Sequence, residues 1–273
     1  DAFEPQYFDS VTIDGQLYAL PVWNDSFVTF YNKEIFDRFG VDHPTDGMSW
    51  EESTALANEI TRNDNGKQYV GQWYSPKHIL RVNQKSLPFV DPETMEPVID
   101  SEGWNEWVTD LFRSPMLDPG LQEAAKQEYF GHDHFRNYEE VAMYTFQTVW
   151  IRQHQFQISL ADWDIVAVPT FDGDGIGVQP YGQYVALSSI SSEPDAAMQV
   201  IKYLTGEEFQ SYMSRIGFIT PLKSQVVRDE YMKENGLEDK NLGAIFYNEL
   251  AAPHPISPFD ELVIDTMHND VLT

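Results

Sequence analysis

The stretch Gly15-Gln-Leu-Tyr-Ala-Leu-Pro21 is followed ten residues later by Tyr31-Asn-Lys-Glu-Ile-Phe36, and then by Pro44 and Ser49-Trp-Glu-Glu52. The apolar run before Pro21 and the β-branched and aromatic residues over 26–31 predict short strands on either side of a polar crossover. Ser49 with an acid three positions later is a capping box, which predicts that a helix begins there. The predicted order is therefore strand, crossover, strand, capped helix.

Helices and strands interleave through the rest of the chain. Residues 11–22 predict two short strands around a turn at Asp14-Gly15, and Lys33 to Phe39 predicts a helix that ends at Gly40. Further strands are expected over 141–146, 164–168 and 184–188. This alternation is typical of the α/β class.

Three later helices are predicted from caps and apolar spacing. A helix from Ser101 places Trp104, Trp107, Val108 and Leu111 on one buried side. A helix from Pro194 should bury a second apolar face, and a capping box of Thr205 with Glu208 should start the next helix. The residues expected to be buried on the helix from Pro194 are Ala196, Ala197, Val200, Ile201 and Leu204.

The ordered crossover motifs resemble family 1 extracellular solute-binding proteins, the capture subunits of ABC importers for sugars. That family shows DGK-x-YG-x-P, a crossover, YNK-x-x-F, a Pro and TW-x-E; here Gln16, Ala19 and Ser49 replace the usual Lys, Gly and Thr. The resemblance continues through Phe135 to Met143 and Gln147-Thr-Val-Trp150, where Tyr138 and Thr148 stand at frequent Gly positions. It extends to the following segments: Val166-Ala-Val-Pro169, Gly173 to Gly177, Tyr181-Gly182-Gln183 and 194–221.

The resemblance implies a periplasmic-binding-protein-like (type II) α/β fold of two lobes joined by hinge crossovers. By analogy, lobe 1 is an incomplete remnant made of residues 1–24 plus 182–248, and lobe 2 comprises 25–181 plus 249–273. The strands and helices that members carry before the crossover, and one or two final helices, have no counterpart in these 273 residues. The chain is therefore expected to be a fragment, truncated at both ends relative to maltose-binding-protein-like members.

Composition narrows the classes of ligand and chemistry. The net charge of −27 opposes binding of nucleic acid, which needs clustered Lys and Arg. With no cysteine, thiolate catalysis and Cys-ligated zinc are excluded. Aromatic residues make up 14% of the chain and include seven Trp, which favours a site that stacks on sugar rings, although most of them are expected in the core. The acidity fits either an exported protein or one adapted to high salt.

The resemblance places the ligand between the lobes, with the crossover residues on the cleft floor. Asp25 matches a position where sugar-binding members often place an acid, and Trp23 would supply a stacking face. For each residue the alternative is a place in the core or in a solvated turn. The expected ligand-binding residues are Trp23, Asn24, Asp25, Trp73, Tyr74, Gln147, Trp150, Tyr181, Gly182, Gln183 and Phe259.

Two motifs weakly resemble metal sites. His132-Asp-His134 has alternate imidazoles but no third ligand by spacing, and Asp172-Gly-Asp-Gly175 lacks the terminal Glu of a calcium loop. A polar loop and a plain turn are the better interpretations. No metal, no cofactor and no catalytic residue are expected.

Two classes of function remain open from the sequence. The first is a binding module that captures a neutral sugar or oligosaccharide and delivers it to ABC permease subunits; no Gly-x-x-x-x-Gly-Lys loop for ATP occurs. The second is a glycoside hydrolase, since 44 acidic residues guarantee chance pairs, although no hydrolase signature is present. A third, within the same fold, is capture of a polyamine or a peptide. The resemblance also implies an extracellular, lipid-anchored or periplasmic protein whose anchor would lie outside this chain.

Overall fold

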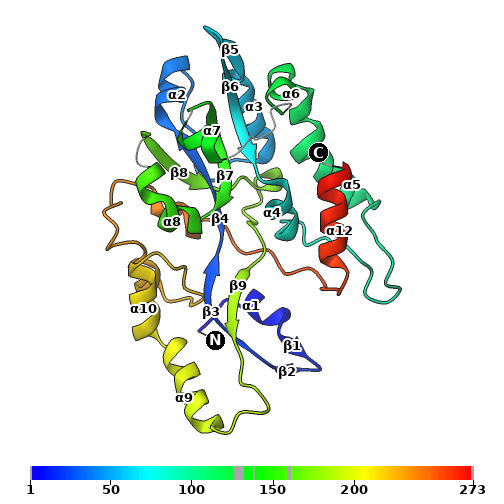
Figure 1. The fold of residues 1–273 in the computed structure, drawn as a ribbon, viewed down its shortest axis with the longest axis vertical. Helices are drawn as coiled ribbons and strands as arrows, with labels where there is room; N and C mark the ends of the chain where they lie inside the picture. Colours follow the sequence, from blue (N-terminus) through cyan, green and yellow to red (C-terminus); the bar gives the residue numbers. More distant parts are fainter. Residues whose placement is uncertain (1, 126–131, 138, 159–160, 272–273) are drawn as a thin grey trace.

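The computed structural model describes residues 2–125, 132–137, 139–158 and 161–271. The chain forms two bodies of unequal size (Figure 1). In the orientation of that figure, the upper body contains a five-stranded sheet with helices around it. The lower body contains the N-terminal segment, a two-stranded sheet and two consecutive helices. This agrees with the α/β class expected from the alternating elements.

The five-stranded sheet forms the centre of the upper body. Its strand order is β5-β6-β7-β4-β8, in which only β6 and β7 run parallel and the other neighbours are antiparallel. All six residues of β4 are buried, because the strand lies between β7 and β8 and is covered on both faces. The strands are β4 (Phe27–Asn32), β5 (Arg62–Asp64), β6 (Lys67–Tyr74), β7 (Val141–Gln147) and β8 (Trp163–Ala167).

Two antiparallel strands join the bodies. β3 (Leu20–Asp25) pairs with β9 (Tyr181–Val185), with Asp25 opposite Tyr181 and a register shift between Pro21 and Trp23. Only Ser26 separates β3 from β4, so one extended stretch runs from the lower body into the upper sheet. The strand expected over 184–188 instead begins at Tyr181, because its main chain pairs with the end of β3.

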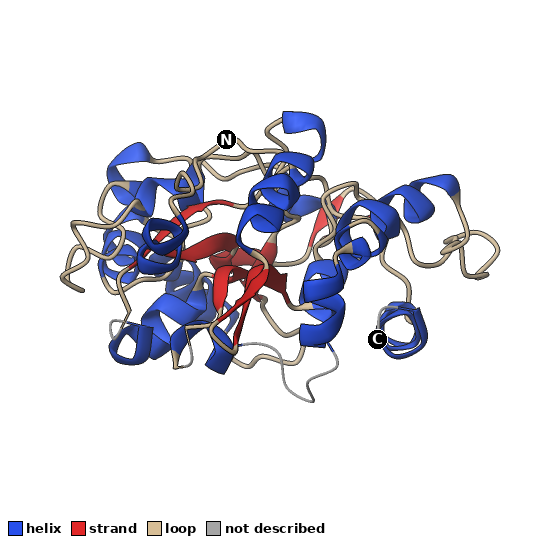
Figure 2. Ribbon diagram, turned by 90° about the horizontal axis from the view of Figure 1, so that it is seen from above, coloured by secondary structure: helices blue, strands red, loops and turns tan. Residues whose placement is uncertain are grey.

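Helices cover both faces of the upper sheet, as the view from above shows (Figure 2). The predicted helix bounds hold for α2 (Lys33–Phe39), which ends at Gly40 in the left-handed conformation. The predicted start also holds for α3 (Trp50–Ile60), where Ser49 and Glu52 form both bonds of the capping box. The other helices of this body are α4 (Pro76–Arg81), α5 (Glu102–Val108), α6 (Pro119–Ala125), α7 (His132–Arg136), α8 (Val149–Ile158) and α12 (Asp260–Thr266).

Shorter turns of other helical geometry extend or connect these helices. The four apolar side chains predicted on one side of the helix from Ser101 are all buried, and that helix continues beyond α5 as a π-helical turn. The short segments are Thr109–Arg113 and Met267–Val271 (π), with Pro115–Leu117, Phe171–Gly173 and Leu242–Phe246 (3-10). No helix among the described residues is both long enough and apolar enough to cross a bilayer.

The lower body holds α1 (Gln6–Asp9), the hairpin β1 (Thr12–Ile13) and β2 (Gln16–Leu17), α9 (Pro194–Leu204) and α10 (Glu207–Arg215). The prediction of a capping box at Thr205 was wrong. Gly206 is the N-cap of α10, and the Thr205 hydroxyl donates instead to the carbonyl of Ile201, at the end of α9. Thr205 therefore closes the preceding helix.

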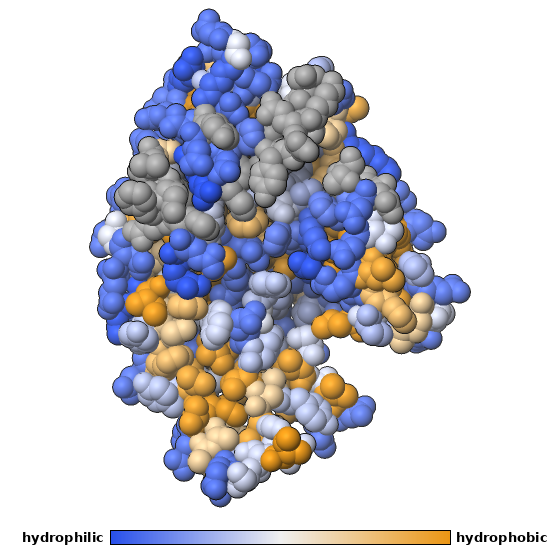
Figure 3. Space-filling model, viewed as in Figure 1, coloured by the Kyte–Doolittle hydropathy of each residue, from blue (hydrophilic) through white to orange (hydrophobic). Residues whose placement is uncertain are grey.

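The predicted burial of the α9 face was also wrong. Of its five expected apolar residues only Ile201 is buried, and Val200 is 57% exposed. The helix has the predicted apolar pattern, but no described segment packs over most of it. Figure 3 shows apolar residues gathered over the lower body, while the upper body is mainly hydrophilic on the same face.

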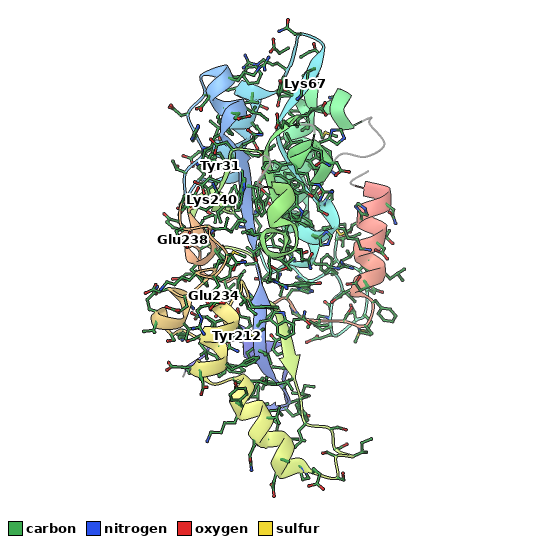
Figure 4. The ribbon with its side chains drawn as sticks, turned by 60° about the vertical axis from the view of Figure 1, so that its left-hand side comes forward. Tyr31, Lys67, Tyr212, Glu234, Glu238 and Lys240 are labelled. Carbon is green, nitrogen blue, oxygen red and sulfur yellow. The ribbon has the colours of Figure 1, made fainter. Side chains whose placement is uncertain are left out.

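After α10 the chain climbs back along the upper body. Figure 4 follows this path from Tyr212 past Glu234 and Glu238 to Lys240. The short α11 (Gln225–Arg228) lies on it. Five later residues belong to the core cluster that contains Phe30: Tyr231, Met232, Leu237, Ala244 and Ile245. The assignment of residues 182–248 to lobe 1, and of 25–181 with 249–273 to lobe 2, stays a prediction.

Candidate functional site

A cavity of about 260 Å³ opens where the two bodies meet. Its wall comes from the end of β3, the start of β9, the turn between β7 and α8, and the loop after α10. Elements from both bodies thus face one space. The lining residues are Trp23, Asn24, Asp25, His78, Gln147, Thr148, Val149, Arg152, Tyr181, Gln183, Gly217, Phe218 and Ile219.

Asp25 links the crossover to the first turn of α8. Its Oδ1 accepts from the Thr148 hydroxyl, from the backbone N–H of Val149 at 3.0 Å and from the backbone N–H of Ser26 at 3.0 Å. Burial raises the pKa of this carboxyl, while these three donors oppose the shift. Asp25 therefore acts as an acceptor that fixes α8 against the hinge, in a position lining the cavity.

Asn24 holds two other segments of the cavity wall in place, the start of β9 and the loop after α10. Its side-chain Oδ1 accepts from the backbone N–H of Tyr181 at 2.9 Å, and its own N–H donates to the carbonyl of Ile219 at 2.9 Å. The side chain is almost fully buried. Asn24 thus ties β9 and the loop after α10 to β3 directly beside the cavity.

An aromatic pair lines the same space. The rings of Trp23 and Phe218 meet edge to face with centroids 5.5 Å apart, and the guanidinium of Arg152 lies 3.9 Å from the Phe218 centroid. These contacts fix the orientation of planar side chains on which a ring-shaped ligand can stack. The cavity therefore combines aromatic faces with carboxylate, amide and guanidinium groups.

The structure brings together six of the predicted residues: Trp23, Asn24, Asp25, Gln147, Tyr181 and Gln183. Gly182 lies opposite Asn24 in the β3–β9 ladder and is not part of the lining. The ladder fixes it between two lining residues, so its backbone supports the wall.

The other four predicted residues lie elsewhere. Tyr74 and Trp150 are buried in core clusters, Trp73 packs partly buried against one, and Phe259 is 47% exposed at the N-cap of α12. The Trp150 ring packs edge to face on Phe30 with centroids 4.9 Å apart, which keeps it in the core of the upper body.

Sequence reasoning missed several lining residues, notably His78, Thr148, Arg152 and Phe218. The sequence did mark Thr148 as unusual, because it stands where the family that this chain resembles often has Gly. It needs no positive φ, and its hydroxyl supplies a donor to Asp25. His78 sits near the start of α4 with its Nδ1 2.7 Å from the Ser75 hydroxyl, and burial lowers its pKa. Arg152 and Phe218 carry no local motif.

No group of acidic and histidine side chains that could hold a metal occurs within the described ranges. In the His132-Asp-His134 motif, His134 pairs with Glu140 at 2.7 Å, and the side chain of His132 is outside the described part. In the second, Asp174 accepts from the backbone N–H of Ile176, as a turn does. Tyr138, noted for replacing a Gly, also lies outside the described residues.

The profile of the bacterial extracellular solute-binding protein family matches residues 1–238. The chain belongs to this family. This solute-binding protein is also similar to a probable ABC transporter-binding protein of Deinococcus radiodurans, with 19% identity over 264 residues. That alignment covers 93% of this chain and 62% of the relative. A second relative, a mannitol-binding protein of Pseudomonas aeruginosa, is 30% identical over 67 residues, which are 24% of this chain and 15% of that one.

Solved structures share the fold of this solute-binding protein. An ABC substrate-binding protein of Listeria monocytogenes in complex with cycloalternan superposes with a TM-score of 0.72 at 19% identity, covering 97% of this chain and 68% of that one. A sugar transporter of Rhizobium etli in an open conformation gives 0.72 at 19% identity, with 97% and 71% covered. The sugar-binding protein MalE of Xanthomonas citri gives 0.69 at 17% identity, with 97% and 67% covered. The predicted type II two-lobe fold is confirmed.

Proposed function

We propose that this protein captures a sugar or oligosaccharide in the cavity between its two bodies and delivers it to the membrane subunits of an ABC importer. The observation that carries the proposal is the composition of the cavity wall, which takes residues from both bodies and from the strands that join them. A ligand held there contacts both bodies at once and favours their closed arrangement.

The chemistry of the wall suits a sugar. Trp23 and Phe218 offer aromatic faces to the C–H side of a sugar ring, and Gln147 and Gln183 offer amides to its hydroxyls. Relatives of the same fold have been solved with cycloalternan and with mannobiose. These sugars support the class of ligand rather than its identity.

The proposed role is capture without chemical conversion. The relatives are binding proteins of transporters, and Asp25, the acid in the cavity lining, is committed to three hydrogen-bond donors. A hydrolase instead needs two carboxyl groups on either side of the scissile bond. Release of reducing sugar from glycans incubated with the protein would contradict this role.

The partners and location follow from the same proposal. An importer's capture subunit works outside the cytoplasmic membrane, either in a periplasm or tethered to the outer face by a lipid. Its membrane partner would be the permease of that importer. Co-purification of a transporter complex from membranes, dependent on added sugar, would test this arrangement.

A thermal-shift screen of the full-length protein tests the ligand class. The panel contains neutral mono- and oligosaccharides, acidic saccharides, polyamines and short peptides. We expect one glycan class to raise the melting temperature by several degrees, because a ligand that binds only the folded state stabilises it. A shift with polyamines alone would move the proposal to capture of a cation, and one with peptides alone to a peptide importer.

A pair of variants locates the binding. Trp23→Ala removes an aromatic face from the cavity, whereas Tyr18→Ala removes an exposed ring of the lower body that does not line it. The glycan shift should fall for Trp23→Ala and persist for Tyr18→Ala. An equal shift in both variants would place the sugar outside this cavity.

A further inference from the structure

Arg152 lies in the cavity wall, and no described residue pairs with its charge. It belongs to the first turn of α8 and is partly exposed. Among the residues that the structure describes, its guanidinium forms no hydrogen bond or ion pair, and its Nε is buried without an acceptor. A partly buried cation without an acceptor is costly, so an acceptor supplied by a ligand would stabilise it.

The guanidinium is held in position before any ligand arrives. Its Cζ lies 3.9 Å from the centroid of the Phe218 ring, and Gly217, at a φ of +91°, lies beside its stem. A Cβ at Gly217 would come within 3.5 Å of the Arg152 Cδ. A side chain ordered in this way loses little further freedom when it binds.

The neighbouring acid does not satisfy Arg152. Asp25 lines the same cavity, but its Oδ1 is occupied by Ser26, Thr148 and Val149. No ion pair joins the two side chains, although the charge of Arg152 opposes the rise in the Asp25 pKa. Asp25 thus accepts hydrogen bonds at the start of α8, and the guanidinium of Arg152 remains available to a ligand in the cavity.

Other cations near the cavity are committed elsewhere. Lys77 pairs with Asp265, and Arg81 pairs through two nitrogens with Glu261. His78 lines the cavity, but its pKa is lowered chiefly by burial, which favours its neutral form. Within the described lining, Arg152 is the charged donor left for a ligand.

We propose that the captured sugar carries a carboxylate, as a uronic-acid-containing saccharide does, and that the fork of Arg152 binds this group. The inference rests on the proposed function and replaces the expected neutral sugar with an acidic one. A guanidinium matches a carboxylate with two parallel N–H···O bonds, which a single sugar hydroxyl does not offer. The protein's net charge of −27 repels anions at long range, so selection of an acid requires such a local contact.

Paired ligands test the inference. Binding of uronate-terminated disaccharides to the full-length protein is measured by calorimetry, each beside the neutral disaccharide with CH2OH in place of the carboxylate. We expect the acidic member of the matching pair to bind about tenfold or more tightly, the usual size of a charge-assisted contact. The preference should weaken as salt is added.

Three variants assign that preference to Arg152. R152Q should remove the preference for the acid, and R152K should restore part of it, because lysine keeps the charge but loses the fork. R113Q is the matched control, since Arg113 is exposed and distant in sequence from the cavity lining. Circular dichroism confirms that each variant is folded.

The outcomes separate this inference from the proposed function. Equal or tighter binding of the neutral sugars would overturn the acidic ligand and leave sugar capture standing. A preference for the acid that survives R152Q would overturn the role of Arg152. If neither neutral nor acidic saccharides bind the folded protein, sugar capture itself fails, and this inference fails with it.

Discussion

Strand β4 in the upper body and helix α9 in the lower body are both apolar elements, but their surroundings differ. Every residue of β4 is buried between β7 and β8, and Phe30 at its centre packs against three other aromatic rings. On α9 the apolar stripe is equally regular, yet Val200 and Met198 are more than half exposed.

An apolar pattern therefore determines the type of an element, whereas its burial depends on a second surface that packs against it. The 3.6-residue spacing on α9 correctly predicted a helix, because spacing defines one face. Burial requires a second surface, and no described segment covers this face. Most of the stability of the described chain should therefore reside in the upper body.

The largest expected effect compares the two elements directly. Phe30→Ala opens a cavity among packed rings and should lower the free energy of unfolding by about 3–5 kcal/mol. Val200→Ala on the exposed face should change it by less than about 0.5 kcal/mol. Urea unfolding followed by circular dichroism gives both values. A Val200→Ala cost near that of Phe30→Ala would contradict the exposure of this face and show that a partner covers α9 in solution.

A smaller effect tests how tightly the upper body is packed. A Cβ at Gly71 on β6 would lie 2.0 Å from the backbone oxygen of Ala57 on α3, so Gly71→Ala must push helix and sheet apart. We expect a loss of about 1–3 kcal/mol. Gly243→Ala is the control, because its nearest neighbour would be 3.8 Å away. Equal thermal stability of the two variants would mean that α3 does not rest on β6 as described.

The smallest effect concerns the junction between the bodies and depends on pH. Burial raises the Asp25 pKa above its ordinary value of 3.8, so in the window above 3.8 the folded state holds a proton that the unfolded chain has lost. The free energy of unfolding therefore falls as pH rises through that window. Asp25→Asn keeps an oxygen acceptor but removes this titration, so its stability relative to the parent should rise across the same window and then level off.

Asp91→Asn provides a control of opposite sign. Backbone N–H groups of Thr94 and Glu93 lower the Asp91 pKa, so this carboxylate stabilises the fold above its ordinary pKa and loses that contribution as pH falls. Relative to the parent, this variant should become less stable as pH rises through the same region. Parallel curves for the two variants would show that Asp25 is not the buried acid described.

Much of the fold followed from local chemistry. Gly40 and the Ser49–Glu52 box set the end of α2 and the start of α3 because each acts within one helical turn. The position of β9 did not follow, since its start is fixed by pairing with Asp25, far away in sequence. Thr205 was misassigned because one hydroxyl can serve either of two adjoining helices, and tertiary context selects between them.

The candidate site was predictable where it coincides with the crossover. Trp23, Asn24 and Asp25 line the cavity because the motif places them where β3 passes into the upper sheet. Trp150 also follows β7 closely in sequence, but its ring packs on Phe30 in the core of the upper body, so local sequence did not show whether it faces the cavity. Phe218 lies 195 residues from Trp23 in sequence, so their contact arises only from the complete fold.

The order in which the cavity wall is synthesised has a consequence for folding. The hydrogen bond between Asp25 and Thr148 joins residues 123 positions apart, and the one between Asn24 and Tyr181 joins residues 157 positions apart. Neither bond can form until the later residue has been synthesised. Closing such long loops costs entropy before the new contacts repay it, so the junction forms late. A ligand therefore has no binding site while the chain is still folding. Ligand binding should lower the unfolding rate of the folded protein and leave the folding rate nearly unchanged.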